Sequence, residues 1–312
     1  MSKPEILFVG DGPDWYLQRF AQDFVLHRLP GGGAAALDPA VAARVEALVA
    51  AGPVDAALID ALPALRLIAN AGAGYEKVDV AAAGRRNIPV TNTPDVTDGC
   101  VADLALGLLL AVGREIVRGD RFVRDGRWSS GGYPLARRFH GRRMGVLGLG
   151  RIGQAIAARA RAFDMSIAYH NRRKVPGVDA VHHPSLLSLA AACDYLVVAC
   201  PGGDATHHLV DRAALEALGP DGIVVNISRG AVIDEQALIE ALETGAIAGA
   251  GLDVFEHEPE VPERLKALEN VVLTPHRGGG TVETWEAACD LVKANLRAFF
   301  DGKPLLTPIG EC

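Results

Sequence analysis

The stretch Gly148-Leu149-Gly150-Arg151-Ile152-Gly153 has the glycine spacing of a phosphate-binding turn. It directly follows the apolar run Met144–Leu147 and opens a segment with helical periodicity, Gln154–Phe163. A strand, a glycine turn and a helix in this order bind a dinucleotide, because the glycines allow a tight turn and a close approach of the pyrophosphate. The free N–H groups of the helix N-terminus favour the anion. The residues expected to bind the dinucleotide are Gly148, Gly150, Arg151, Ile152 and Gly153.

The end of the next expected strand, Ser166–Tyr169, indicates which dinucleotide binds. An NAD site usually has an Asp or Glu about 20 residues after the glycines, where it binds the ribose 2′-OH. Here the strand runs into His170-Asn171-Arg172-Arg173-Lys174, with no acid. Arginines bind a 2′-phosphate through charge-assisted hydrogen bonds, whereas a carboxylate would repel it. We predict NADPH held by Asn171, Arg172 and Arg173, with NADH as a weaker cofactor; the alternative is that these basic side chains are merely solvated.

Length and charge limit the class of protein. With 312 residues, the chain is long enough for two domains with separate cores. Its 31 basic and 38 acidic residues give a formal charge of −7, which argues against nucleic acid or a membrane surface as partner. The arginine-rich segment 114–143 also contains acids, so we interpret it as a solvated or subunit-contacting face.

The five cysteines form no CxxC pair and no metal-ligand spacing, so we expect reduced thiols and no metal. The N-terminus passes into the strand-like run Ile6–Val9 without a signal sequence. The longest apolar stretch, 104–113, has about half the length of a membrane-spanning helix. We therefore expect a cytoplasmic protein.

The first third of the chain predicts a small parallel α/β domain. The expected strands are Ile6–Val9, Phe24–Leu29, Ala56–Ile59, Leu67–Asn70 and Pro89–Thr91. The expected helices between them are Pro39–Ala51 and Val80–Arg86.

A long helix, Gly99–Val117, leads into a second alternating region. Its expected strands are Gly145–Gly148, Ser166–Tyr169, Tyr195–Cys200, Ile223–Ile227, Gly249–Leu252 and Val271–Thr274. Its expected helices are Ile152–Phe163, Ser185–Ala192, Arg212–Leu218 and Glu235–Glu243, and a last helix, Val282–Phe300, follows the region. This order predicts an α/β protein with two Rossmann-like or flavodoxin-like domains and doubly wound parallel sheets. An NADP-binding domain, 99–281, would be inserted into a split substrate domain, 1–98 plus 282–312, with the ligand in a cleft between them.

Among nine histidines, His276 has a distinctive position. It follows the expected strand Val271–Thr274 and a proline, so it stands at the carboxyl end of a sheet strand, where open α/β sheets place their sites. A loop histidine without a role is the alternative. The pairs His182-His183 and His207-His208 are not expected to bind metal, because side chains of sequence neighbours point apart.

Two other strand ends supply groups that suit the same chemistry. Arg229 follows Ile223–Ile227, and Glu258 follows Gly249–Leu252 by a few residues. A guanidinium can hold a 2-oxo carboxylate and polarise its carbonyl. A carboxylate beside an imidazole favours the protonated ring, which can then donate a proton to the alkoxide that hydride transfer creates. We predict a reductase of 2-oxo acids with Arg229, Glu258 and His276 as catalytic residues.

From about residue 67 to residue 308 the sequence resembles the D-isomer-specific 2-hydroxyacid dehydrogenases. The motifs that carry the resemblance are Ala73-Gly74-Tyr75, Asn92-Thr93-Pro94, the glycine stretch 148–153, Asn226–Gly230, Gly251–Phe255 and Thr274-Pro275-His276. The resemblance implies a dimer with Arg229 as substrate binder, His276 as acid/base and Glu258 as its partner. It also implies that Asp253 binds the nicotinamide carboxamide, that the backbone of Ala73 and Gly74 binds the substrate carboxylate, and that Tyr133 closes the partner subunit's pocket.

Within that family the chain looks most like the NADPH-preferring glyoxylate/hydroxypyruvate reductases and the similar hydroxyphenylpyruvate reductases. The shared segments are Tyr169–Lys174, Leu196–Pro201 and Thr281–Thr284. Many members read His-Ile-Gly-Ser where this chain has His276-Arg277-Gly278-Gly279, which leaves the choice of 2-oxo acid open. The expected reaction reduces glyoxylate or hydroxypyruvate to glycolate or D-glycerate; the alternative is a larger aromatic 2-oxo acid.

Two other functional classes remain as alternatives. Some proteins that resemble this family are non-catalytic dinucleotide sensors that act as corepressors, and they keep the same Arg, Glu and His. The sequence shows no appended disordered tail or basic arm, which disfavours that hypothesis. A lyase or hydrolase that uses bound cofactor internally would release no NADP⁺ with its product.

Overall fold

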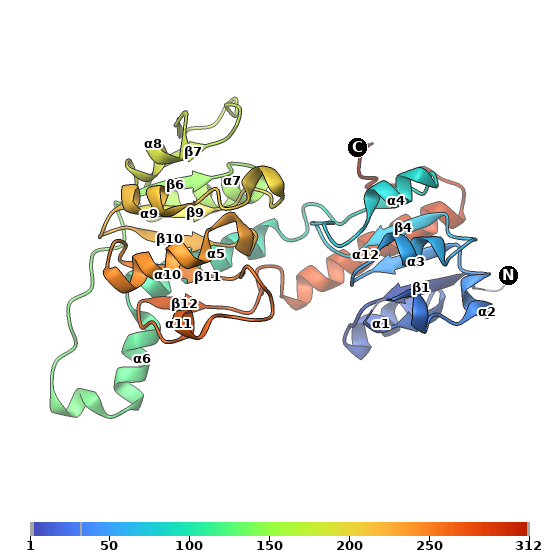
Figure 1. The fold of residues 1–312 in the computed structure, drawn as a ribbon, viewed down its shortest axis with the longest axis horizontal. Helices are drawn as coiled ribbons and strands as arrows, with labels where there is room; N and C mark the ends of the chain where they lie inside the picture. The colour runs from blue at the N-terminus through green and yellow to red at the C-terminus, as the bar shows by residue number, and fades with distance from the viewer. Residues whose placement is uncertain (1–2, 32, 311–312) are drawn as a thin grey trace. The chain divides into compact units, whose positions relative to one another are not determined.

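The computed structural model describes residues 3–31 and 33–310, and Figure 1 shows its fold. These residues form two compact units. Unit 2 runs from Asp98 to Gly280, and unit 1 consists of the described residues before and after it. Each unit has one sheet in which all neighbouring strands are parallel. The prediction of an α/β protein with two parallel sheets is confirmed.

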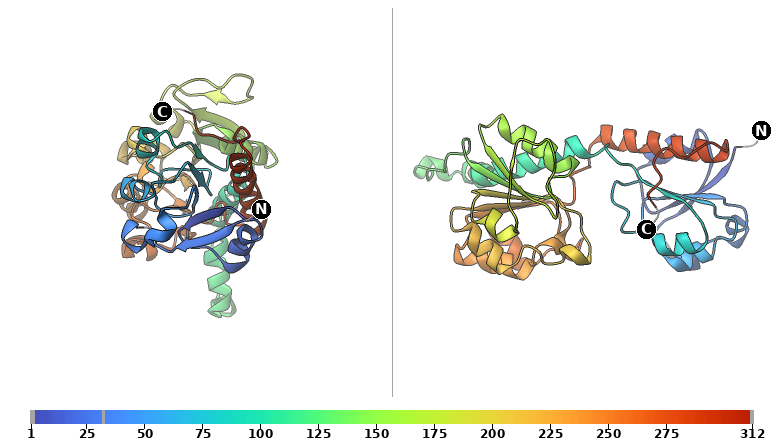
Figure 2. Two further views of the ribbon diagram at one scale, coloured as in Figure 1. Left: turned by 90° about the vertical axis from the view of Figure 1, so that its right-hand side faces the viewer. Right: turned by 90° about the horizontal axis from the view of Figure 1, so that it is seen from above.

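Unit 1 has a five-stranded sheet in the order β2-β1-β3-β4-β5. Its strands are β1 (Glu5–Val9), β2 (Val25–Leu29), β3 (Ala47–Ala50), β4 (Leu67–Asn70) and β5 (Val90–Thr91). Its helices are α1 (Asp14–Ala21), α2 (Pro39–Ala42), α3 (Ala56–Asp60), α4 (Val80–Arg85) and α12 (Val282–Phe300), with a short 3-10 helix η1 (Ala34–Ala36). Ile6 and Phe8 pack with α1 and α12, whereas Leu7 and Val9 pack with α3 and α4 on the other face. Both faces are therefore covered, as the right-hand view of Figure 2 shows.

Two of the expected elements in unit 1 are wrong. The segment Pro39–Ala51 is not one helix, because α2 ends at Ala42 and strand β3 follows. Alanine favours helix, but all four residues of β3 are buried between β1 and β4, and this packing overrides the local propensity. The segment Ala56–Ile59 is helix α3 and not a strand, because the side chain of Asp55 caps it by accepting a hydrogen bond from Leu58 N at 2.8 Å.

Unit 2 has a seven-stranded sheet in the order β12-β11-β10-β9-β6-β7-β8. Its strands are β6 (Arg143–Leu147), β7 (Ser166–His170), β8 (Val181–His182), β9 (Tyr195–Val198), β10 (Ile223–Asn226), β11 (Gly249–Leu252) and β12 (Val271–Leu273). Its helices are α5 (Asp98–Gly113), α6 (Ile116–Arg124), α7 (Arg151–Arg161), α8 (Leu186–Ala190), α9 (Arg212–Leu218), α10 (Glu235–Thr244) and α11 (Glu263–Lys266), with 3-10 helices η2 (Arg127–Ser130), η3 (Asp204–Thr206) and η4 (Gly230–Val232). Helices α5 and α7 cover one face, and α8, α9 and α10 cover the other. Because the strands are parallel, every loop that follows a strand lies at one edge of this sheet.

The expected helix Gly99–Val117 is divided in two. Helix α5 ends at Gly113, and Glu115 adopts a φ of +51°, a left-handed conformation that interrupts the helical hydrogen bonds before α6 begins. Helix α6 buries none of its residues, and it projects from unit 2 in Figure 1. We call residues 114–136 the arm.

The structure also bears on the thiols and on membrane association. Cys100, Cys193, Cys200 and Cys289 are free thiols, and the fifth cysteine, Cys312, lies outside the described residues. Burial raises the pKa of Cys193 to about 12, so this thiol is unreactive at neutral pH. Within residues 3–31 and 33–310, no helix is both long and apolar enough to cross a membrane.

Candidate active site

The glycine turn joins β6 to α7. Each of its three glycines is required, or has space around it, for a different structural reason. Gly148 has a φ of +96°, and a Cβ there would lie 2.5 Å from the backbone nitrogen of Cys200. A Cβ at Gly153 would lie 2.3 Å from the carbonyl oxygen of Gly148, so this glycine lets α7 approach the strand. A Cβ at Gly150, the residue that precedes α7, would meet nothing within 4 Å. The open space at Gly150, next to the N-terminus of α7, fits a pyrophosphate.

The other residues expected to bind the dinucleotide differ in their contacts and in their exposure. The Asn171 Oδ1 atom accepts a hydrogen bond from Leu149 N at 2.7 Å, so it holds the glycine turn. Arg172 and Arg173 are exposed after β7, and neither guanidinium has a carboxylate partner in the described part of the chain. The Arg151 side chain pairs with Asp98 at 3.4 Å but is largely exposed, and Ile152 packs against the core.

Glu258 and His276 lie in direct contact. The distance from His276 Nδ1 to Glu258 Oε2 is 2.8 Å, and the second carboxylate oxygen of Glu258 accepts a bond from Phe255 N at 3.2 Å. Half of the His276 side chain is exposed, and its Nε2 makes no hydrogen bond with any described residue. The ring is therefore oriented at one nitrogen and open at the other.

Asp253 holds the loop that carries His276. Its Oδ1 accepts bonds from Thr274 Oγ1 at 2.6 Å and from Arg277 N at 2.7 Å, and its Oδ2 accepts one from Gly278 N at 2.8 Å. The carbonyl of Asp253 accepts a bond from His276 N at 2.8 Å, and His276 has a φ of +52°. Asp253 is only 1% exposed. The expected contact of Asp253 with a nicotinamide carboxamide stays a prediction, because Oδ2 accepts only one bond from a described residue and keeps a second lone pair.

Arg229 follows β10, which pairs with β11, and β11 in turn pairs with β12. One of its guanidinium nitrogens, Nη1, donates to the carbonyl of Ser228 at 2.7 Å. A Cβ at Gly202 would lie 2.6 Å from Arg229 Cγ, so this glycine makes room for the arginine. Gly202 was not among the expected site residues, although the run Pro201-Gly202-Gly203 after a strand was a visible signal. Arg229, Glu258 and His276 follow three adjacent strands at one edge of the sheet.

Ala73 and Gly74 lie after β4 in unit 1, on a loop held by two asparagines. Asn92 Nδ2 donates to the carbonyl of Ala73 at 2.8 Å, and Asn70 Nδ2 donates to the carbonyl of Gly74 at 2.9 Å. The N–H groups of Ala73 and Gly74 donate to no described residue, so they are available to an anion. The two asparagines were not expected in this role.

Tyr133 lies on the arm. Its hydroxyl donates to Glu115 Oε2 at 2.8 Å, and its ring packs edge-on against Phe122 at a centroid distance of 5.2 Å. Burial and the Glu115 carboxylate raise the pKa of this hydroxyl. Tyr133 is thus bonded within its own chain.

A glycine turn for a dinucleotide, an arginine and a Glu–His pair at one edge of a parallel sheet are typical of NAD(P)-dependent oxidoreductases.

Comparison with known proteins agrees with this class. Residues 106–278 match the family described as "D-isomer specific 2-hydroxyacid dehydrogenase, NAD binding domain". A hydroxyphenylpyruvate reductase from Plectranthus scutellarioides is 52% identical over 82% of this chain and 82% of that protein. A glyoxylate/hydroxypyruvate reductase A from Arabidopsis thaliana is 51% identical over the same shares. The solved structure of an NADPH-dependent glyoxylate/hydroxypyruvate reductase from Sinorhizobium meliloti, in complex with NADP and malonate, has a TM-score of 0.94 at 44% identity, over 99% of this chain and 97% of that one.

The chain belongs to the D-isomer-specific 2-hydroxyacid dehydrogenases. It is an NAD(P)-dependent enzyme that reduces 2-oxo acids to 2-hydroxy acids.

Proposed function

We propose that this enzyme uses NADPH to reduce a small 2-oxo acid, such as glyoxylate or hydroxypyruvate, with His276 as the proton donor. The observation that carries the proposal is the 2.8 Å bond between His276 Nδ1 and Glu258, which leaves Nε2 open. Relatives named glyoxylate/hydroxypyruvate reductase, at 51% and 44% identity, support the substrate class.

The roles of the two units follow from their residues. Unit 2 would bind NADPH through the backbone of the glycine turn and the N-terminus of α7, with Arg172 and Arg173 on the 2′-phosphate. Bound NADPH supplies a hydride to the carbonyl carbon of the substrate. Unit 1 would contribute the free N–H groups of Ala73 and Gly74, which suit a carboxylate.

The catalytic residues then complete the reaction. Arg229 would hold the substrate carboxylate and draw electron density from the carbonyl oxygen. When the carbonyl carbon accepts a hydride, His276 Nε2 donates its proton to the oxygen, and a 2-hydroxy acid forms. Glu258 accepts a hydrogen bond from Nδ1, which keeps the ring in place and leaves Nε2 for the substrate. Asp253 would act as a positioning residue, because it bonds to the loop that carries His276.

We also propose that the enzyme is a homodimer that associates through the arm. Four large apolar side chains are exposed on it: Ile116 at 54%, Val123 at 54%, Trp128 at 68% and Leu135 at 99%. Apolar side chains exposed together on a segment without a core of its own mark an interaction surface. Sedimentation should give a dimer for the wild type and a monomer for Trp128→Asp combined with Leu135→Asp. A wild-type monomer at micromolar concentration refutes this part of the proposal.

A reductase of aromatic 2-oxo acids is the second candidate. It is supported by the relative named hydroxyphenylpyruvate reductase, which at 52% is as similar to this chain as the glyoxylate/hydroxypyruvate reductase at 51%. Initial rates with glyoxylate, hydroxypyruvate and hydroxyphenylpyruvate, each with NADPH and with NADH, test both candidates. The proposal expects the highest kcat/KM for one of the two small acids with NADPH. A higher value for the aromatic acid selects the second candidate.

The choice of NADPH has its own test. Arg172→Ala removes a charge-assisted hydrogen bond to the 2′-phosphate, worth about 1.5–3 kcal/mol, so the KM for NADPH should rise about 10- to 100-fold. The KM for NADH should stay the same. Arg264→Ala is the control, since Arg264 is also exposed but pairs with Glu243 at 2.7 Å on another part of unit 2. An unchanged ratio of NADPH to NADH efficiency in Arg172→Ala contradicts the assignment.

A further inference from the structure

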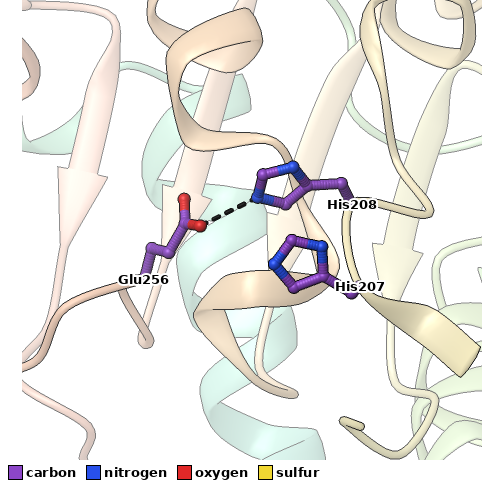
Figure 3. Close-up of side chains that lie close together, drawn as sticks. All are labelled: His207, His208 and Glu256. Atoms are coloured by element: carbon purple, nitrogen blue, oxygen red, sulfur yellow. Dashed lines mark hydrogen bonds and ion pairs between the residues drawn. The ribbon is translucent and has the colours of Figure 1, made fainter. Parts of the chain in front are cut away.

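His207, His208 and Glu256 form a cluster that the proposed reaction does not use. The two histidines follow η3, in the loop after β9, and Glu256 lies in the loop after β11 (Figure 3). One nitrogen from each ring and one carboxylate oxygen all lie within 4.8 Å of one another. His208 Nε2 and Glu256 Oε1 are 2.8 Å apart. Three groups that can each donate an electron pair therefore lie close together.

The sequence-based expectation that the side chains of His207 and His208 point apart is wrong. Neighbouring side chains diverge in extended backbone, but His208 has a φ of +49°. This left-handed conformation, uncommon for a residue other than glycine, turns the two rings to the same side. Their centroids are 3.9 Å apart and their planes are inclined by 24°, so the imidazoles stack, as Figure 3 shows.

The backbone fixes this arrangement. His208 N donates to the carbonyl of Ala231 at 2.7 Å, and Val210 N donates to that of Val232 at 2.9 Å. The Thr206 hydroxyl donates to the carbonyl of Pro201 at 2.8 Å. On the other side, Glu256 N donates to the Glu235 carboxylate at 3.3 Å. Since the loops are held before any ligand binds, little ordering is needed to form a site.

We propose that His207, His208 and Glu256 bind one divalent transition-metal ion, of which Zn²⁺ is the best fit. Imidazole nitrogen and carboxylate oxygen are common zinc ligands, at about 2.0–2.2 Å from the metal, so ligand atoms around one tetrahedral ion lie about 3.3 Å apart. The three atoms lie within 4.8 Å of one another, so side-chain rotations must shorten their separations and tilt the stacked rings until both lone pairs point at the ion. The His208 and Glu256 side chains are 35% and 19% exposed, which leaves a path for the ion and for water as a further ligand.

The other adjacent pair, His182 and His183, shows that neighbouring histidines alone do not make such a site. His182 Nε2 lies 3.2 Å from the carbonyl of Asn171, and His183 Nδ1 lies 3.1 Å from Ser188 Oγ. Each ring is bonded separately to a neutral group. In the described part of the chain, only the cluster of His207, His208 and Glu256 brings three candidate ligands together.

Calorimetric titration of the full-length, tag-free protein with ZnCl₂ alone tests the proposal. We expect saturable binding of one ion. Removing an outer partner of a metal ligand already weakens affinity about 10- to 100-fold, so loss of a direct ligand in His207→Gln or Glu256→Gln should weaken it at least tenfold. His183→Gln is the matched control and should bind like the wild type. Because Co²⁺ would meet only nitrogen and oxygen, its near-ultraviolet spectrum should lack a sulfur-to-cobalt charge-transfer band.

Either of two results overturns the proposal. One is the absence of saturable Zn²⁺ binding to the wild type. The other is binding that His207→Gln and Glu256→Gln leave unchanged while circular dichroism shows both variants folded, which would place the ion elsewhere, for example at cysteines or at the His276–Glu258 pair. NADPH oxidation by the same variants separates this proposal from the proposed function, because neither residue belongs to the proposed catalytic set.

Discussion

Two glycines of the dinucleotide turn should respond to the same substitution in different ways. At Gly153 an alanine Cβ would lie 2.3 Å from the Gly148 carbonyl oxygen, so α7 must move by at least 0.7 Å to restore 3.0 Å. Overpacking of this kind costs about 1–3 kcal/mol, and the better helix propensity of alanine returns about 0.5–1 kcal/mol. We expect a net loss of about 1–2 kcal/mol in the free energy of unfolding.

At Gly150 the same substitution should leave the stability of the cofactor-free protein unchanged, because the alanine Cβ would meet nothing within 4 Å. The methyl group would instead occupy the space that the pyrophosphate needs. Loss of one or two charged hydrogen bonds, at about 1.5–3 kcal/mol each, predicts a Kd for NADPH at least tenfold higher.

Calorimetric melting without cofactor and a fluorescence titration with NADPH separate the two effects. For a domain of this size, about 1 kcal/mol shifts the Tm by about 2–4 °C, so Gly153→Ala should lower the Tm of unit 2 by about 2–8 °C. Gly150→Ala should melt like the wild type and bind NADPH poorly. An unchanged Tm in Gly153→Ala refutes the packing argument, and normal NADPH affinity in Gly150→Ala refutes the phosphate site.

Three further substitutions test single contacts. His276→Ala should lower kcat about 10²- to 10⁴-fold and leave the Kd for NADPH unchanged, as measured by stopped-flow and fluorescence; a loss below tenfold excludes His276 as the acid. Asp253→Asn should cost about 1–3 kcal/mol of stability in urea unfolding, because the amide nitrogen cannot accept the bonds that the carboxylate oxygen accepts; wild-type stability contradicts its role in the loop. Asp23→Asn should cost about 2 kcal/mol at pH 7, because it removes the negative charge 2.6 Å from the buried Lys293 ammonium, which keeps only its hydrogen bond to the Arg19 carbonyl. The Lys293 ammonium holds the pKa of Asp23 below its usual value. This contribution is therefore complete above the unfolded-state pKa of about 3.9 and disappears as the pH falls through the lower folded-state value, so wild type and Asp23→Asn should converge in acid.

The sequence predicted the bounds of some elements in both units. Strand β11, helix α9 and, in unit 1, helix α12 begin and end at the expected residues. Glycine turns, strand periodicity and aspartate caps mark these elements locally, which is why they could be found without the structure. The contact between Glu258 and His276 was expected for the same reason, since two neighbouring parallel strands end at one edge.

The structural features that the sequence did not predict depend on contacts between residues far apart in the chain, or on backbone torsion angles. The alanine-rich strand β3 is set by its burial between two other strands, which local propensity does not reveal. The stacking of His207 on His208 depends on a single positive φ, and no residue type other than glycine signals such an angle strongly. The bonds from Asp253 to the His276 loop join residues more than 20 positions apart.

The way Asp253 holds the His276 loop has an evolutionary consequence. Two of its three side-chain bonds go to backbone N–H groups, those of Arg277 and Gly278. Every residue except proline offers that group, so side chains at positions 277 and 279 are free to vary while the imidazole keeps its orientation. Changes of side chain at these two positions should therefore leave the orientation of the imidazole, and with it the proton transfer, undisturbed, so this segment can diverge at little cost to the reaction.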